Sequence, residues 1–243
     1  MSKIIIERPY ITVTNIIWSF DPEKQEINVL LIKREAEPFQ SFWALPETLL
    51  REGESAHDAS LRLVKEKIGL ELSDIHSEQL ATFTAPERNP DYRALSLSYM
   101  IFLPQNLKLI PGPGAKDVSW FSVKMQKNQI FTFNKDDLKF KTLRNNEYLM
   151  TKNSKIRLAF DHNWILTVAC HRVFNKLDYQ PTILLILGSS FTLKSARYIF
   201  ECFGKYEPDN SNFLQNHKQH LKPTGEEESN GPGRPAKKYF LTL

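Results

Sequence analysis

Two strand-like runs separated by a short polar turn constrain the fold of the first half of the chain most strongly. The runs are ITVTNIIWSF (11–20) and INVLLIKR (27–34), and the residues DPEKQE join them. β-Branched and aromatic residues favour extended strands, so this pattern predicts a β-hairpin. Further strand-like runs follow at 79–84, 94–103 and 118–123. With the helix-like segment that precedes them, they predict a mixed α/β domain.

The helix-like segment GESAHDASLRLVKEKIGL (53–70) carries its own start and stop signals. Ser55 can cap the helix N-terminus, and Asp58 stands three residues later in an approximate capping box. Gly69 can end the helix because glycine readily adopts the left-handed conformation. We therefore predict a helix between Ser55 and Gly69.

The pattern changes near residue 153. Apolar residues recur at helical spacing over 155–177, and shorter helices are expected at 191–204 and 209–221. A polar loop rich in Gly and Pro and a strand with two lysines and aromatic residues end the chain. Helix, short connection, helix and hairpin loop is the order of a winged helix-turn-helix. We predict two domains, residues 1–152 and residues 153–243.

Charge is distributed unevenly between these two parts. Residues 151–243 contain 13 Lys and Arg against 8 Asp and Glu, whereas residues 1–150 contain 19 against 20. A basic C-terminal part beside a neutral N-terminal part fits a nucleic-acid module joined to another domain. The content of 41% hydrophobic residues excludes a chain that is disordered throughout.

Apolar stretches and cysteines bear on the cellular compartment. No stretch reaches the ~18 apolar residues needed to cross a bilayer, and the first 20 residues lack the pattern of a cleaved signal. Cys170 and Cys202 show no metal-ligand spacing, which favours buried thiols in a reducing compartment. We expect a cytoplasmic protein without a membrane partner.

The segment 48–70 resembles the Nudix hydrolase signature G-x5-E-x7-R-E-U-x-E-E-x-G-U, in which U is a bulky apolar residue. Glu54, Arg62, Val64, Glu66, Gly69 and Leu70 match it, whereas Thr48, Leu63 and Lys67 depart from it. The resemblance implies an α/β/α sandwich with a mixed sheet, in which Glu54 and Arg62 form a structural ion pair.

The departures remove the chemistry of that family. In Nudix hydrolases the residues at positions 63, 66 and 67 are carboxylates that hold Mg²⁺, and this spacing puts them on one helix face. Here Glu66 alone is acidic, and Mg²⁺ prefers several hard oxygen ligands. We predict no catalytic residue and no cofactor, with Glu66 a weak metal candidate and Lys67 able to pair with a phosphate directly.

An active Nudix pyrophosphatase of the ADP-ribose type remains an alternative. Its base and Mg²⁺ ligands would then come from elsewhere in the chain, for example from Glu47, Glu52 or Glu87. Mg²⁺ is expected in this alternative alone.

Segments in both halves resemble a family of Nudix-related transcriptional regulators, the NrtR-like family. The matching stretches are LAFDHNWIL (158–166), FTL (191–193), DNSNF (209–213), GRPAKKYFL (233–241) and QLATFTAPERNPDYR (79–93). The resemblance implies a homodimeric bacterial repressor of NAD synthesis or related nucleotide or sugar metabolism. It also implies two partners, a double-stranded DNA operator and a nucleotide effector such as ADP-ribose.

Candidate effector contacts follow from side-chain chemistry. Arg88 and Arg93 can form bidentate contacts to a diphosphate, with Lys67 and Glu66 beside it. Phe83, Phe39 or Trp43 can stack on an adenine, and ordinary core packing is the alternative for each aromatic residue. A third reading makes the Nudix domain a dimerisation scaffold that binds a different ligand, such as a sugar or sugar phosphate.

Candidate DNA contacts lie in the helix expected at 209–221 and in the wing. Asn212, Gln215, Asn216 and Lys218 can donate to bases or phosphates, and Ser211 near the helix start suits a phosphate contact. Arg234 can enter a minor groove, and one of the wing lysines, such as Lys237, can meet a phosphate. Protein contacts by the winged helix are the alternative.

Overall fold

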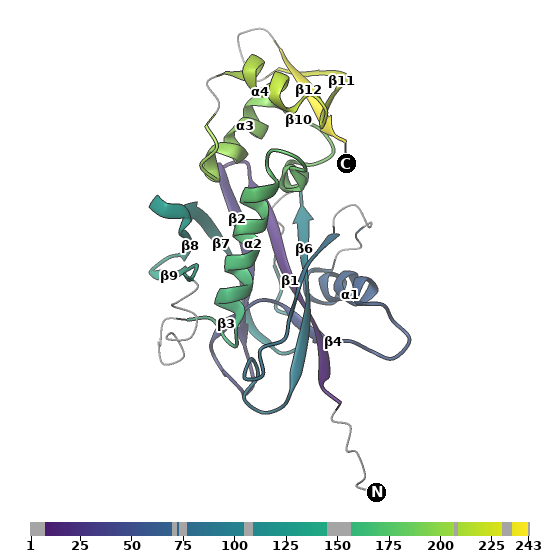
Figure 1. Cartoon of the computed structure of the whole chain (residues 1–243), viewed down its shortest axis with the longest axis vertical. Coiled ribbons are helices and arrows are strands. Elements are labelled where there is room, and N and C mark those ends of the chain that lie inside the picture. The colour runs from purple at the N-terminus through teal and green to yellow at the C-terminus, as the bar shows by residue number, and fades with distance from the viewer. Residues whose placement is uncertain are drawn as a thin grey trace, which may run out of the picture.

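The computed structural model describes residues 8–69, 72, 77–104, 109–144, 157–206, 209–229 and 235–242 (Figure 1). A long mixed sheet forms the first domain, with strands in the order β5-β6-β1-β2-β7-β8-β9, while β3 pairs with β2 and β4 with β1. Its strands are β1 (Tyr10–Asp21), β2 (Glu26–Arg34), β3 (Trp43–Ala44), β4 (Glu47–Leu49), β5 (Ser77–Phe83), β6 (Ala94–Leu103), β7 (Ala115–Met125), β8 (Phe131–Lys135) and β9 (Leu138–Lys141).

The central hairpin of this sheet confirms the prediction from residues 11–34. β1 and β2 pair antiparallel from Trp18↔Val29 to Asp21↔Glu26. β1 also runs parallel to β6, in register from Tyr10↔Ala94 to Ser19↔Leu103. β1 is therefore hydrogen-bonded on both sides, which explains why its middle is rich in fully buried β-branched residues.

Helix α1 (Ala56–Ile68) covers one face of the sheet. Ser55 and Asp58 form the predicted capping box, and Gly69 ends the helix in the left-handed conformation with φ 77°. Ala59 and Val64 pack with Val13 and Ile17 of β1 in a shared hydrophobic cluster.

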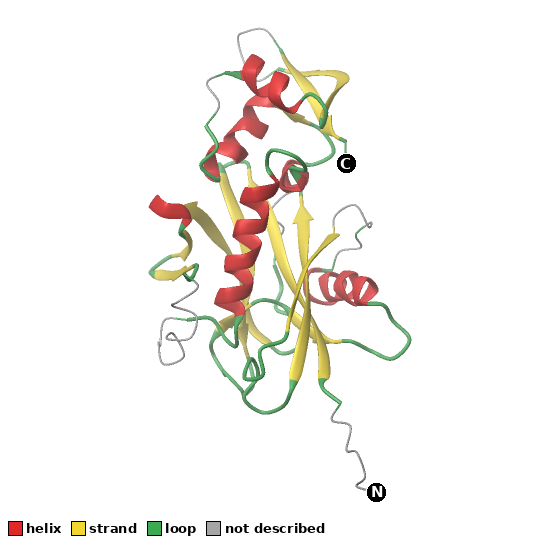
Figure 2. Ribbon diagram, in the orientation of Figure 1, coloured by secondary structure: helices red, strands yellow, loops and turns green. Residues whose placement is uncertain are grey.

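Helix α2 (His162–Lys176) covers the other face (Figures 1 and 2). Ile165 and Val173 of α2 pack with Ile16 and Trp18 of β1, whose side chains alternate in direction with those that face α1. The sheet is thus the middle layer between two helices, as the resemblance implied. The predicted boundary near residue 152 stays a prediction, but α2, which follows it, packs on the first domain.

The C-terminal elements form a winged helix. They are a 3-10 helix η4 (Thr182–Leu187), β10 (Phe191–Thr192), α3 (Leu193–Cys202), α4 (Asn210–His217), β11 (Leu221–Glu228) and β12 (Ala236–Leu241). Thr192 caps α3 and Asp209 caps α4 through side-chain bonds to backbone N–H groups. β10, β12 and β11 form a three-stranded sheet beside the two helices.

Two expected helices need correction, and one hairpin was not predicted. The helix expected over 155–177 begins at His162, because residues 157–161 form bends and a turn before it. The helix expected at 209–221 ends at His217, because Leu221 begins a strand that pairs with Leu241. The hairpin of β8 and β9, joined to β7 by the 3-10 turn η2 (Lys127–Gln129), was not predicted.

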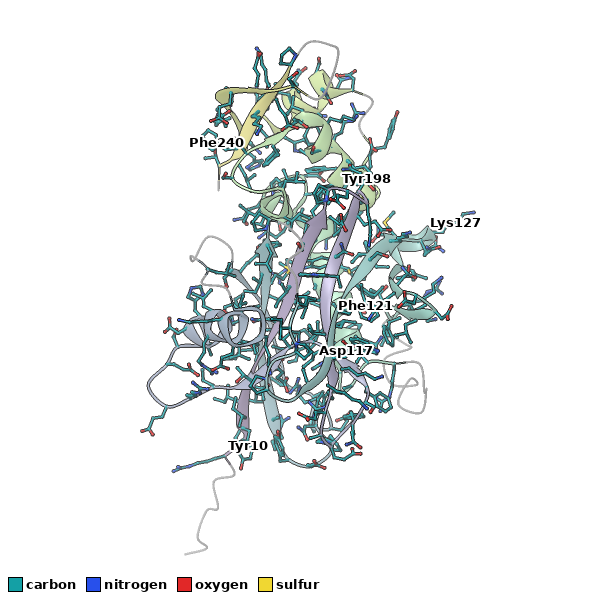
Figure 3. All side chains as sticks on the ribbon, turned by 180° about the vertical axis from the view of Figure 1, so that it is seen from behind. Tyr10, Asp117, Phe121, Lys127, Tyr198 and Phe240 are labelled. Carbon is teal, nitrogen blue, oxygen red and sulfur yellow. The ribbon has the colours of Figure 1, made fainter. Side chains whose placement is uncertain are left out.

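The winged helix packs directly on the first domain. One hydrophobic cluster runs from Trp18 in the sheet through Ile183 of η4 to Phe203 and Phe213. The Tyr198 hydroxyl of α3 donates to the carbonyl of Gln25 in the β1–β2 turn, and Figure 3 shows Tyr198 at this junction. The sheet and α2 therefore contact the helices of the second domain directly, so a movement of the first can displace the second.

In the described part of the chain, no helix combines the length and hydropathy that a membrane crossing requires.

Candidate functional site

Residues 63, 66 and 67 of α1 form the face that holds Mg²⁺ in Nudix hydrolases, here called the former metal face. In this chain these residues make other interactions. Leu63 is fully buried and Glu66 is engaged by two arginines, Arg51 at 3.0 Å and Arg62 at 3.1 Å. The Lys67 ammonium donates to the carbonyl of Pro113. Burial lowers the pKa of Lys67, and the nearby Glu66 opposes this shift.

The structural ion pair of the box is intact. Arg62 donates from Nε and Nη2 to the two oxygens of Glu54, at 2.9 and 2.7 Å. This bonding to Arg62 lowers the pKa of Glu54 to about 2. Arg62 also donates to the carbonyl of Leu49, so the pair fastens the loop before α1 to the helix.

These residues do not fit a bound Mg²⁺. The sole remaining carboxylate, Glu66, is neutralised by Arg51 and Arg62, and position 63 offers a buried hydrocarbon. A divalent ion needs several free oxygen ligands. Among the described residues, no three His, Cys, Asp or Glu side chains lie close enough together to hold a metal ion.

A buried polar cluster joins β4 to the start of α2. Arg88 bonds Asp161 with two nitrogens, Nε–Oδ2 at 3.2 Å and Nη2–Oδ1 at 3.0 Å, and its Nη2 lies 3.4 Å from Glu47 Oε2. The same Glu47 oxygen accepts hydrogen bonds from Thr12 and Thr14. Four backbone segments far apart in sequence are therefore tied together at the N-terminal end of α2.

His162 belongs to this cluster. The backbone N–H of Leu45 donates to His162 Nδ1 at 2.9 Å, which leaves the ring proton on Nε2, 3.9 Å from Glu47. Burial alone favours the neutral carboxylic acid at Glu47, but His162, Arg88 and Thr14 favour the carboxylate and lower its pKa to about 2. Glu47 is thus held as a carboxylate, and its low pKa makes it a weak proton acceptor.

The structure places the predicted effector residues apart. Arg88 is buried in the cluster above, whereas Arg93 donates to the carbonyls of Thr84 and Ala85 and holds that loop. Phe83 is buried in the core of the α2 face, and Trp43 packs edge-on against Phe121. Both rings are packed in the core, and stacking of either on an adenine stays a prediction.

Two cavities lie where β2 and β3 end and α2 begins. The smaller, about 170 Å³, is lined by Phe39, Glu87, Arg88, Pro90, Leu143, Arg157, Phe160, Asp161, Asn163 and Trp164. The larger, about 520 Å³, is lined by Lys33, Ser41, Phe42, Trp43, Asp117, Lys135, Asp136, Asp137, Leu138, Lys139, Phe140 and Arg157.

Arg88, Phe39 and Trp43, which were predicted as candidate effector contacts, line these cavities, whereas Arg157 was not predicted. Arg157 directly precedes the stretch LAFDHNWIL (158–166), which carried the family resemblance and was the available signal.

Helix α4 presents a polar face to solvent. Asn212, Gln215 and Asn216 are exposed at spacings of three and four residues, with Ser211 and Lys218 exposed at its ends. On the opposite side Phe213 packs against Phe200 with ring centroids 4.9 Å apart. The helix is therefore held by its apolar side, and its amide side chains form a surface that can enter a DNA groove.

The wing carries acids beside its lysines. Lys237 lies across from Glu227 in the β11–β12 pairing, and Lys238 forms an ion pair with Glu228 at 3.5 Å. These carboxylates offset the positive charge that would attract phosphates. Arg234, the predicted minor-groove residue, lies outside the described residues.

Comparison with protein families and known proteins gives the following matches. A family model described as NUDIX domain matches residues 10–142, and one described as NrtR DNA-binding winged helix domain matches residues 183–241. Over 196 residues the chain is 26% identical to the "ADPR responsive transcriptional repressor NtrR" of Acinetobacter baylyi. That alignment covers 79% of this chain and 66% of the relative, so the chain spans just under two thirds of the relative's length.

Solved structures resemble the whole chain. A MutT/nudix family protein from Enterococcus faecalis is 31% identical with a TM-score of 0.83, covering 100% of this chain and 90% of that one. NrtR of Shewanella oneidensis complexed with a 27mer DNA gives 24% identity and a TM-score of 0.70, covering 96% and 93%. Its NUDIX domain complexed with ADP ribose gives 22% and 0.50, covering 69% and 90%. The likeness to the Shewanella protein concerns the fold alone.

Proposed function

Since this chain belongs to the Nudix family, we propose that it is an ADP-ribose-responsive transcriptional repressor in which the Nudix fold binds its ligand without hydrolysing it. The ligand and the activity are taken from the Acinetobacter relative, which is described as an ADPR responsive repressor. The match of residues 183–241 to the NrtR DNA-binding winged helix domain supports operator binding by the second domain.

The observation that carries the proposal is the state of the former metal face. A Nudix hydrolase needs carboxylates that are free to bind Mg²⁺, which polarises the pyrophosphate and activates water. In this chain Glu66 is bound by Arg51 and Arg62, Leu63 is buried and Lys67 is positively charged. We therefore expect this domain to bind a nucleotide without hydrolysing it, so that binding itself acts as the signal. No cofactor is part of the proposal.

The proposed DNA contact uses the exposed face of α4. Asn and Gln side chains can make paired hydrogen bonds to adenine in the major groove. A repressor of this type acts as a homodimer in the cytoplasm, with two α4 helices reading half-sites about one turn, ~34 Å, or a multiple of it apart.

Two experiments test the proposal. Pull-down of genomic fragments followed by sequencing is expected to recover a promoter, and ADP-ribose is expected to change the mobility shift of that fragment. Incubation with ADP-ribose and Mg²⁺ separates the enzyme alternative, because turnover of ~1 s⁻¹ or faster is ordinary for an enzyme. Such turnover, or no selective recovery of DNA, would overturn the proposal.

A further inference from the structure

Arg157 lines both cavities at the start of α2 and is the one lining residue that they share. Apolar and aromatic groups, among them Phe39, Phe160 and Trp164, dominate the smaller cavity. The larger cavity combines aromatic and apolar side chains with lysines and aspartates of β2, β7 and the β8–β9 hairpin, and Asp117, marked in Figure 3, stands on its wall. A ligand with a ring at one end and hydroxyl groups at the other would match these two hollows, with Arg157 common to both.

The Arg157 guanidinium has no anionic partner among the described residues. It lies over the rings of Phe39, at 4.9 Å, and Phe42, at 6.0 Å. Burial lowers the pKa of Arg157. A half-buried cation that rests on aromatic rings is desolvated without an ion pair, so a bound anion would stabilise it.

The backbone around these cavities is strained. Among the described residues, seven non-glycine residues have a positive φ, and four of them line these cavities: Phe39 at 64°, Ser41 at 65°, Asp136 at 48° and Phe160 at 54°. Side chains at such φ values are disfavoured, and strained residues of this kind concentrate at ligand sites. The remaining three, Gln25, Asn128 and Gln129, lie in other turns.

We propose that Arg157 binds the diphosphate of a nucleoside diphosphate sugar, with the base in the smaller cavity and the second sugar in the larger one. This inference rests on the proposed function, because it locates the effector. A cavity of about 170 Å³ lies below the ~300–1,000 Å³ typical of sites that enclose a whole ligand, and it suits a single ring system. The lysines and aspartates of the larger cavity can hydrogen-bond sugar hydroxyls.

The location differs from that of the former hydrolytic centre. No residue of the box, 48–70, lines either cavity. Instead Asp161, the residue that precedes α2, forms part of the smaller cavity's wall. A ligand here contacts the start of α2, and α2 extends ~22 Å toward η4 and the winged helix.

A third hollow, about 550 Å³ between β2, β7 and β8, is a weaker candidate. None of the residues that line it is an arginine, the side chain that makes paired hydrogen bonds to a diphosphate.

The test uses the full chain, titration calorimetry and three probes: ADP-ribose, NAD⁺ and UDP-glucose. Arg157→Gln is expected to weaken the binding of whichever probe binds the wild type by at least tenfold, and Arg157→Lys by less. Arg51→Gln is the matched control, since it removes the same charge at the box, and it is expected to change affinity less than twofold. Thermal melting shows whether each variant is folded, and Lys139→Gln, at an exposed position of β9, gives a second variant in the larger cavity.

The outcomes separate the site from the proposed function. If ADP-ribose binds and Arg157→Gln has wild-type affinity, or if Lys67→Gln causes the loss instead, the effector lies elsewhere and the inference is overturned while the repressor proposal stands. If ADP-ribose fails to bind but another probe binds and depends on Arg157, the site stands and the proposed effector fails. If none of the three probes binds, both are overturned.

Discussion

Arg88 and Asp161 face each other through two parallel hydrogen bonds inside the protein, with 1% and 3% of their side chains exposed. The pair fixes the residue that precedes α2 to the loop at 84–93. A planar guanidinium suits a carboxylate in this two-point geometry. Because α2 leads to the winged helix, this pair fixes the start of the helix that connects the two domains.

Asp161→Ala is expected to destabilise the protein by about 3–5 kcal/mol, since it leaves a buried guanidinium with the more distant Glu47 as its anionic partner. Urea unfolding followed by tryptophan fluorescence measures the loss. The double variant Arg88→Met, Asp161→Leu removes both charges and is expected to recover most of the stability. A loss below 1 kcal/mol in Asp161→Ala would mean that water replaces the pair.

Glu47 makes the free energy of unfolding depend on pH in the acidic range. Its folded pKa is about 2, below the ordinary value of 4.5, so its contribution is present above pH 4.5 and is lost as the pH falls toward 2. The shift corresponds to about 3 kcal/mol. Comparing the free energies of unfolding of wild type and Glu47→Gln between pH 3 and 7 isolates this effect, because other acids such as Glu54 are common to both. A stability difference that stays constant across this range would contradict the assignment.

Gln215→Ala is expected to weaken operator binding by about 1–3 kcal/mol and to relax base preference at one position, because an amide can read adenine with two hydrogen bonds. Lys218→Ala should instead weaken binding to all sequences alike and lower the salt dependence by about one counterion. Mobility shifts at several salt concentrations, with operator and scrambled DNA, distinguish the two effects. Equal losses on both DNAs for Gln215→Ala would remove it from base reading.

Local signals predicted the elements that depend on local chemistry. The hairpin at 11–34, the capping box of Ser55 and Asp58 and the stop at Gly69 are fixed by neighbours in sequence, and all are confirmed. The early end of α4 depends on the pairing of Leu221 with Leu241, a distant partner that periodicity cannot reveal.

The candidate site was predicted less completely for the same reason. The departures at Leu63 and Lys67 were visible in the sequence, and the burial of one and the carbonyl contact of the other were not. Arg88 was singled out as a polar-loop residue, but its partner Asp161 lies 73 residues away. The roles of the individual residues in binding stay predictions.

The wing offers a last prediction, because Glu227 and Glu228 stand beside the lysines that would meet DNA. An exposed ion pair is worth ~0.2–1 kcal/mol, and its carboxylate also repels phosphate. Glu228→Gln is therefore expected to raise DNA affinity about 1.5- to 5-fold and to steepen its salt dependence, since Lys238 is freed for a phosphate. Lys238→Gln in the same background is expected to abolish the gain. If Glu228→Gln leaves both affinity and salt slope unchanged, the wing stays clear of the phosphate backbone, and α4 alone would supply the contact.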